Sequence, residues 1–75
     1  MTIEVYKWAD KYSRDYLVII DDEAFEMDAN SMPNGVNIYL GPKKDIAPAH
    51  MEKKMKMLPI GLVKNILQRC STWES

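Results

Sequence analysis

The sequence predicts an α+β fold: an antiparallel β-meander of four to five strands with one C-terminal amphipathic helix packed on the sheet. Two observations favour it. Apolar and polar residues alternate within residues 2–41, and apolar residues recur every three to four positions after Pro59. A chain of 75 residues builds one small core, so residues 1–75 are expected to form a single domain.

The first two predicted strands differ in their burial. Residues 3–8 alternate between an apolar face and an aromatic, amphipathic face, which is typical of a strand with one side against the core. Residues 16–20 are apolar at every position, with the sequence Tyr-Leu-Val-Ile-Ile. Such a run predicts a central strand that is covered on both faces.

The next two predicted strands follow recognisable turns. Residues 21–23 are three consecutive acids, which predict a solvated turn, and residues 24–29 alternate as a half-exposed strand. A short helix starting at Asp21 is the less favoured alternative. The Pro-Asn-Gly sequence at 33–35 predicts another turn, after which residues 36–40 alternate until Gly41-Pro42 ends the strand.

The last element is a predicted helix that begins near Pro59. At 100° per residue, one side gathers Ile60, Leu62, Val63, Ile66, Leu67 and Cys70. The other side carries Lys64, Asn65, Gln68 and Arg69. Leu67 lies near the middle of the apolar arc, so it is expected to be buried against the sheet, on Val18 or Ile38.

Two interpretations are open for residues 46–57. A cap at Asp45 and apolar residues spaced by four and three positions indicate a helix. The alternation of residues 54–57 instead indicates a loop followed by a fifth strand. We favour the second, because a short link at residues 58–59 would join that strand compactly to the last helix.

Charge divides the chain into two halves. Residues 1–41 carry three basic and eight acidic side chains, a net charge of −5, whereas residues 42–75 carry seven basic and three acidic ones, a net charge of +4. Such a division bears on partners and self-association rather than on fold. A homodimer is therefore expected, held either by these charges or, as we favour, by an apolar patch of methionine and aromatic side chains.

No motif indicates a reaction, a metal or a cofactor. The histidine His50 and the cysteine Cys70 are interpreted as a loop residue and a buried apolar residue rather than a catalytic pair. Residues 28–33 begin like a calcium loop, but Met32 occupies the third ligand position and the required glycine is missing. We expect no catalytic residue, because a chain this small has little room for a substrate pocket of several hundred Å³.

The candidate binding residues lie in the basic part of the chain. They are Lys43, Lys44, Lys53, Lys54 and Lys56, together with Met51, Met55 and Trp73. Lysines attract phosphate backbones and aromatic rings stack on bases, whereas methionine and tryptophan are common in protein interfaces.

The function we expect is that of a small non-enzymatic module that acts through a protein partner. A regulatory or accessory role in a bacterium or a mobile element is the expectation that the chain length suggests. Nucleic-acid binding through the basic segment is the alternative. The single cysteine and the lack of a signal sequence or a membrane-length apolar run predict a cytoplasmic protein without membrane contact.

Overall fold

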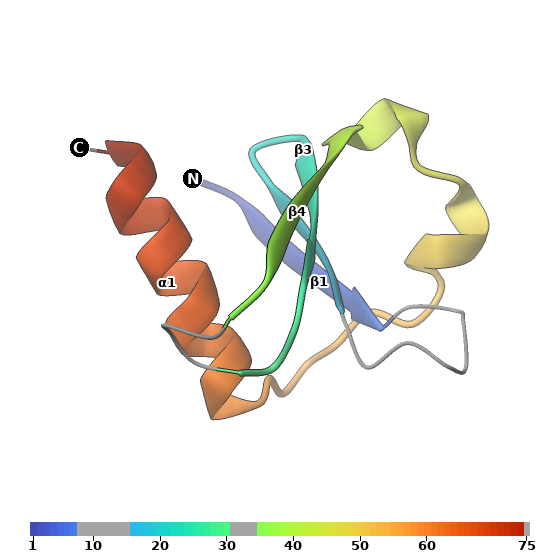
Figure 1. The fold of residues 1–75 in the computed structure, drawn as a ribbon. Helices are drawn as coiled ribbons and strands as arrows, with labels where there is room; N and C mark the ends of the chain where they lie inside the picture. The colour runs from blue at the N-terminus through green and yellow to red at the C-terminus, as the bar shows by residue number, and fades with distance from the viewer. Residues whose placement is uncertain (8–15, 31–34, 75) are drawn as a thin grey trace.

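The computed structural model describes residues 1–7, 16–30 and 35–74, with side chains described as far as residue 70. Its elements are β1 (Ile3–Lys7), β2 (Tyr16–Ile20), β3 (Glu23–Met27), β4 (Asn37–Pro42), the 3₁₀ turns η1 (Lys43–Asp45) and η2 (Pro48–Met51), and α1 (Ile60–Glu74). The strands form one antiparallel sheet in the order β1-β2-β3-β4. The predicted α+β meander is therefore confirmed. Figure 1 shows the sheet between α1 on one side and the two 3₁₀ turns on the other.

The hairpin between β2 and β3 turns on two aspartates. Asp21 has φ 47° and Asp22 has φ 67°, and positive φ at both central residues is the geometry of a type I′ turn. The Asp21 carboxylate accepts a hydrogen bond from the Thr2 backbone N–H at 2.8 Å, which ties the turn to the start of β1. The predicted turn is confirmed at these two residues, while Glu23 already belongs to β3.

One hydrophobic layer lies between the sheet and α1. Its buried residues are Val5, Val18, Ile20, Phe25, Met27, Leu62, Ile66 and Cys70. The helix turns residues 62, 66 and 70 toward the strands, because side chains four apart share one face.

The predicted faces of this helix were wrong at three residues. Ile60, expected on the apolar side, is 72% exposed. Leu67 is 60% exposed, because it follows Ile66 by about 100° around the axis and projects beyond the contact with the sheet. Asn65, expected on the solvent side, is 0% exposed. Its amide donates to Asp28 Oδ1 at 3.5 Å, so the connection after β3 covers that flank of the helix.

A second hydrophobic layer lies on the opposite face of the sheet. Tyr6, Leu17, Ile19 and Ala24 are buried there, and Leu40, Ile46 and Met51 pack against them. The prediction that β2 is covered on both faces is confirmed. The strand β3 is more buried than predicted, because Ala24 lies under this second layer while Phe25 lies under α1.

The segment before α1 is neither of the two predicted structures in full. It forms the two 3₁₀ turns and then a single β-bridge between Lys54 and Tyr6, so the expected fifth strand is reduced to that bridge. Lys7 N–H donates to the Lys53 carbonyl at 2.9 Å, and Met55 N–H donates to the Val5 carbonyl at 2.8 Å. The segment thereby covers part of the outer edge of β1. The turn predicted at 33–35 lies outside the described residues except for Gly35, and Trp8 also lies outside them.

Candidate binding site

An open pocket of about 520 Å³ lies between the β2–β3 turn and the two 3₁₀ turns. It is lined by Asp22, Pro42, Lys43, Lys44, Ile46, Pro48 and Met51. The expectation that this chain has little room for such a pocket was wrong. After Pro42 the chain forms two 3₁₀ turns instead of continuing β4 or forming a helix, and the pocket lies against these turns. Figure 1 shows the two turns on the side of the sheet opposite α1.

Backbone geometry explains why the chain forms this pocket. Pro42 is extended, with φ −66° and ψ 150°, and directs the chain out of β4 into η1. The Lys43 N–H then donates to the Asp22 carbonyl at 2.7 Å, which fastens η1 to the β2–β3 turn. A second proline, Pro48, begins η2, where its missing N–H is no loss. Ile46, between the two turns, packs back on the sheet.

The two lysines of the pocket differ in their electrostatic state. Lys43 Nζ lies 2.9 Å from Glu4 Oε2, and Glu4 Oε1 accepts a further hydrogen bond from the Tyr6 hydroxyl at 3.1 Å. The hydrogen bond from Lys43 lowers the pKa of Glu4, and the same bond raises the pKa of Lys43. Lys43 is therefore a charged lysine already balanced by a carboxylate.

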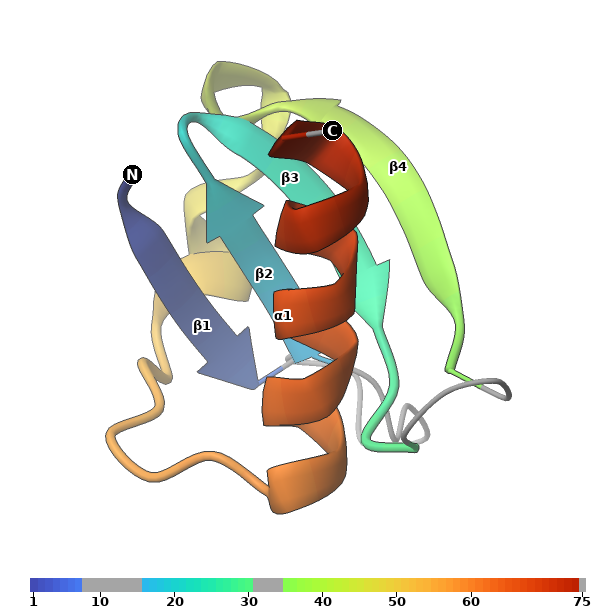
Figure 2. The ribbon, with the colours of Figure 1, turned by 90° about the vertical axis from the view of Figure 1, so that its left-hand side faces the viewer.

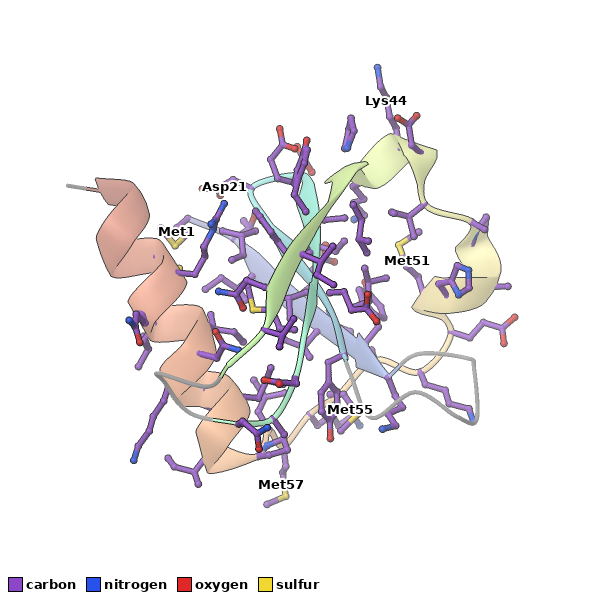
Figure 3. All side chains as sticks on the ribbon, in the orientation of Figure 1. Met1, Asp21, Lys44, Met51, Met55 and Met57 are labelled. Atoms are coloured by element: carbon purple, nitrogen blue, oxygen red, sulfur yellow. The ribbon has the colours of Figure 1, made fainter. Side chains whose placement is uncertain are left out.

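Lys44, by contrast, is exposed and has no ion pair or hydrogen bond with any residue that the structure describes. It is a cation at the mouth of the pocket that remains available to a ligand. Figure 3 shows Lys44 projecting from the outer end of η1, and Met51 below it on the side of the 3₁₀ turns.

The structure unites three of the eight candidate residues and separates the others. Lys43, Lys44 and Met51 all line the pocket. Met55 instead packs against the layer under α1, on the other face of the sheet from Met51. The two methionines therefore do not form one patch.

The remaining candidates lie away from the pocket. Lys53, Lys54 and Lys56 are exposed in the segment that passes the edge of β1. Trp73 lies in α1, with its side chain outside the described residues. Four further residues that line the pocket were not among the predicted binding residues: Asp22, Pro42, Ile46 and Pro48. The position of Ile46 in a short segment between Pro42 and Pro48 was the sequence feature that could have indicated its role.

The described residues form neither a Cys–His catalytic pair nor a metal site. Cys70 is buried in the layer under α1, whereas His50 belongs to η2 on the opposite side of the sheet, so the two cannot act together. The Asp28 carboxylate makes hydrogen bonds within the chain: it accepts from the backbone N–H groups of Asn30 at 3.2 Å and Val36 at 3.1 Å. No group of three His, Cys, Asp or Glu side chains that could hold a metal occurs within residues 1–7, 16–30 and 35–70.

Comparison with models of known families, with curated proteins and with solved structures finds no match to this chain. Within the described part of the chain, no helix is long and apolar enough to cross a membrane.

Proposed function

We propose that this protein is a non-enzymatic module that binds a short segment of a partner protein in the pocket beside η1 and η2. The segment would place an apolar side chain on the pocket floor and a carboxylate against Lys44. The observation that carries the proposal is the combination, in one pocket of about 520 Å³, of apolar lining residues and a lysine, Lys44, that has no ion pair with any described residue.

The floor supports an apolar anchor. Pro42, Ile46, Pro48 and Met51 offer no charge to a ligand, and a pocket of this volume lies within the range of about 300 to 1,000 Å³ that is typical of ligand sites. Methionine suits such a surface because its flexible side chain adapts to different partners. Anchors of this kind supply most of the binding energy in protein interfaces.

The charged residues around the pocket favour a partner segment that carries an acidic residue next to its apolar anchor. Lys44 has no carboxylate partner among the described residues, whereas Lys43 is already paired with Glu4. Asp22 lines the same pocket and repels a carboxylate from its own side. A peptide with Asp or Glu next to a large apolar residue therefore fits the pocket in one orientation.

The same residues argue against catalysis in the pocket. A nucleophilic lysine requires a lowered pKa, whereas the hydrogen bond to Glu4 raises the pKa of Lys43.

A cytoplasmic setting and a regulatory or accessory role belong to this proposal too. The single cysteine of the chain is buried in the core, which suits a reducing compartment.

The test is selection of random peptides displayed on phage, followed by affinity measurement with one synthetic peptide of the enriched sequence. We expect enrichment of a large apolar residue beside Asp or Glu. Lys44→Glu should weaken binding about fivefold to tenfold, because an attraction becomes a repulsion. Lys56→Glu is the matched control, since it reverses another exposed lysine away from the pocket, and it should leave the affinity within about twofold.

A second substitution tests the floor. Met51→Gln keeps the length of the side chain but places an amide in the pocket, and it should also weaken binding of the same peptide. Failure to enrich any peptide, or equal losses for Lys44→Glu and Lys56→Glu, would contradict the proposal.

Nucleic-acid binding is the second candidate, because the structure gathers lysines at the end of β1. The Lys7 N–H bonds to the Lys53 carbonyl, and Lys54 and Lys56 follow in the same exposed segment. Replacing residues 53, 54 and 56 together with Gln should then reduce affinity for a fluorescent DNA duplex and flatten its dependence on salt by up to about 0.9 per lost phosphate contact. Unmeasurable binding of the wild type at physiological salt would exclude this candidate.

A further inference from the structure

We propose that two copies of this chain associate through the outer edge of β4, which extends the meander into one continuous sheet across a two-fold axis at Ile38. The two edge strands of the sheet, β1 and β4, differ in their backbone hydrogen bonds. Residues 53–55 bond to β1 through Lys7 N–H and the Val5 carbonyl, whereas no described residue bonds to the outer side of β4. Figure 2 shows β4 at the free edge of the sheet, with no described segment alongside it.

The backbone of β4 determines which groups are available at that edge. Asp28 N–H donates to the Val36 carbonyl at 3.3 Å, so Val36 directs its polar groups toward β3. Because adjacent residues of a strand alternate, Asn37 and Tyr39 direct theirs outward. The strand ends at Pro42, which has no N–H to offer.

An antiparallel copy satisfies these groups in one register. Asn37 of each chain forms a hydrogen-bonded pair with Tyr39 of the other, and Ile38 faces its own copy in the non-hydrogen-bonded position between them. A C2 axis through this Ile38 pair makes the contact self-complementary, as two-fold interfaces require.

The side chains of β4 fit the same arrangement. Val36 is 45% exposed and Ile38 is 47% exposed, and alternation places both on the face where Leu40 packs against the second hydrophobic layer. In the paired register, Val36 lies opposite Leu40 of the other copy. The contact therefore joins three apolar side chains from each copy and continues the hydrophobic layer of both.

The lack of charged side chains in β4 favours a second copy of the chain as the partner at this edge. A two-fold axis brings identical groups together, and residues 36–42 contain no charged side chain that would face its own copy. Natural edge strands that stay single commonly carry charges, above all lysine, an inserted proline or a β-bulge. The described part of β4 has no charge and no proline before Pro42, and the register shift against Ala24 and Phe25 lies at Leu40, at the end of the paired residues, while Tyr39 is 56% exposed.

Cysteine crosslinking tests the register. Under mild oxidation, Ile38→Cys should give a covalent dimer, since non-hydrogen-bonded pairs have Cα atoms about 4.5 Å apart, within the range of a disulfide. Val36→Cys is the matched control, because its two copies would lie about 13 Å apart along the strands. The wild type, whose cysteine Cys70 is buried, reports the background.

Sedimentation equilibrium of the full chain tests the association itself. The wild type should reach twice the mass of one chain as concentration rises, and Ile38→Lys should remain monomeric because it places two lysines together on the axis. Leu67→Lys, a matched change at an exposed helix position, should still dimerise. Circular dichroism of each variant checks that the fold is retained. A wild type that is monomeric at every concentration, a Leu67→Lys variant that alone fails to dimerise, or a Val36→Cys yield equal to that of Ile38→Cys would overturn the proposal.

Discussion

Substituting Gly35 with alanine tests how closely the connection after β3 approaches α1. A Cβ at position 35 would lie 2.7 Å from Asn65 Nδ2 and 2.9 Å from Asn65 Cγ. Asn65 is fully buried and hydrogen-bonded to Asp28, so its side chain has no room to withdraw. We expect Gly35→Ala to lower the free energy of unfolding by about 1–3 kcal/mol, the usual cost of overpacking.

Repeating the Gly35→Ala substitution in an Asn65→Ala variant separates this clash from other effects of the substitution. Asn65→Ala removes the two closest atoms, and the nearest remaining contact is the Asn30 carbonyl at 3.0 Å. Gly35 does not adopt the positive φ that disfavours alanine, so only the close contact with the Asn30 carbonyl remains, and the substitution should then cost less than it does in the wild type. The two changes are therefore expected to show a coupling energy of about 1–2 kcal/mol.

Urea denaturation of the four proteins in this cycle, followed by far-UV circular dichroism, measures that coupling. In thermal denaturation, each kcal/mol should move Tm by roughly 4–8 °C for a domain of this size. An equal cost of Gly35→Ala in both backgrounds would refute the argument, because the cost would then arise from the backbone rather than from Asn65.

Three further predictions concern other parts of the fold. Leu62→Ala should lower the free energy of unfolding by about 2–5 kcal/mol because Leu62 is fully buried, whereas Leu67→Ala should stay within about 0.5 kcal/mol; comparable losses in urea denaturation would contradict the placement of α1. Asp22→Gly should raise stability by about 1 kcal/mol by relieving the left-handed conformation at φ 67°, and an unchanged Tm would show that no strain exists there. The hydrogen bond from Lys43 lowers the pKa of Glu4, so its stabilising contribution is present above the ordinary value of 4.5 and is lost as the pH falls below it. Glu4→Gln should therefore lose less stability than the wild type in acid titrations, and parallel profiles would contradict the ion pair.

Much of the fold could be predicted from local patterns. A period of two residues identified the four strands, and the uninterrupted apolar run at residues 16–20 marked the central one, because only a strand covered on both faces has no polar side. The helix after Pro59 was equally clear. These features depend on neighbouring residues alone.

The burial of individual helix residues could not be predicted in the same way. The apolar arc of α1 is wider than its contact with the sheet, so Leu67 remains exposed while Asn65 is covered by the connection after β3. That connection lies more than thirty residues away in the sequence, since Asp28 and Asn65 are separated by 37 positions. No helical periodicity contains this information.

The sequence by itself determined the four strands, the C-terminal helix and their order, because alternation, apolar runs and turn residues act over a few positions, but it did not determine the two 3₁₀ turns between β4 and α1. It also marked Lys43, Lys44 and Met51 as candidate binding residues. Only the tertiary structure decided that these three share a pocket, while Met55 lies on the opposite face of the sheet. The physical reason is a long-range contact: the Lys43 N–H bonds to the Asp22 carbonyl, 21 positions earlier in the chain, and this hydrogen bond fixes the 3₁₀ turns against the β2–β3 hairpin.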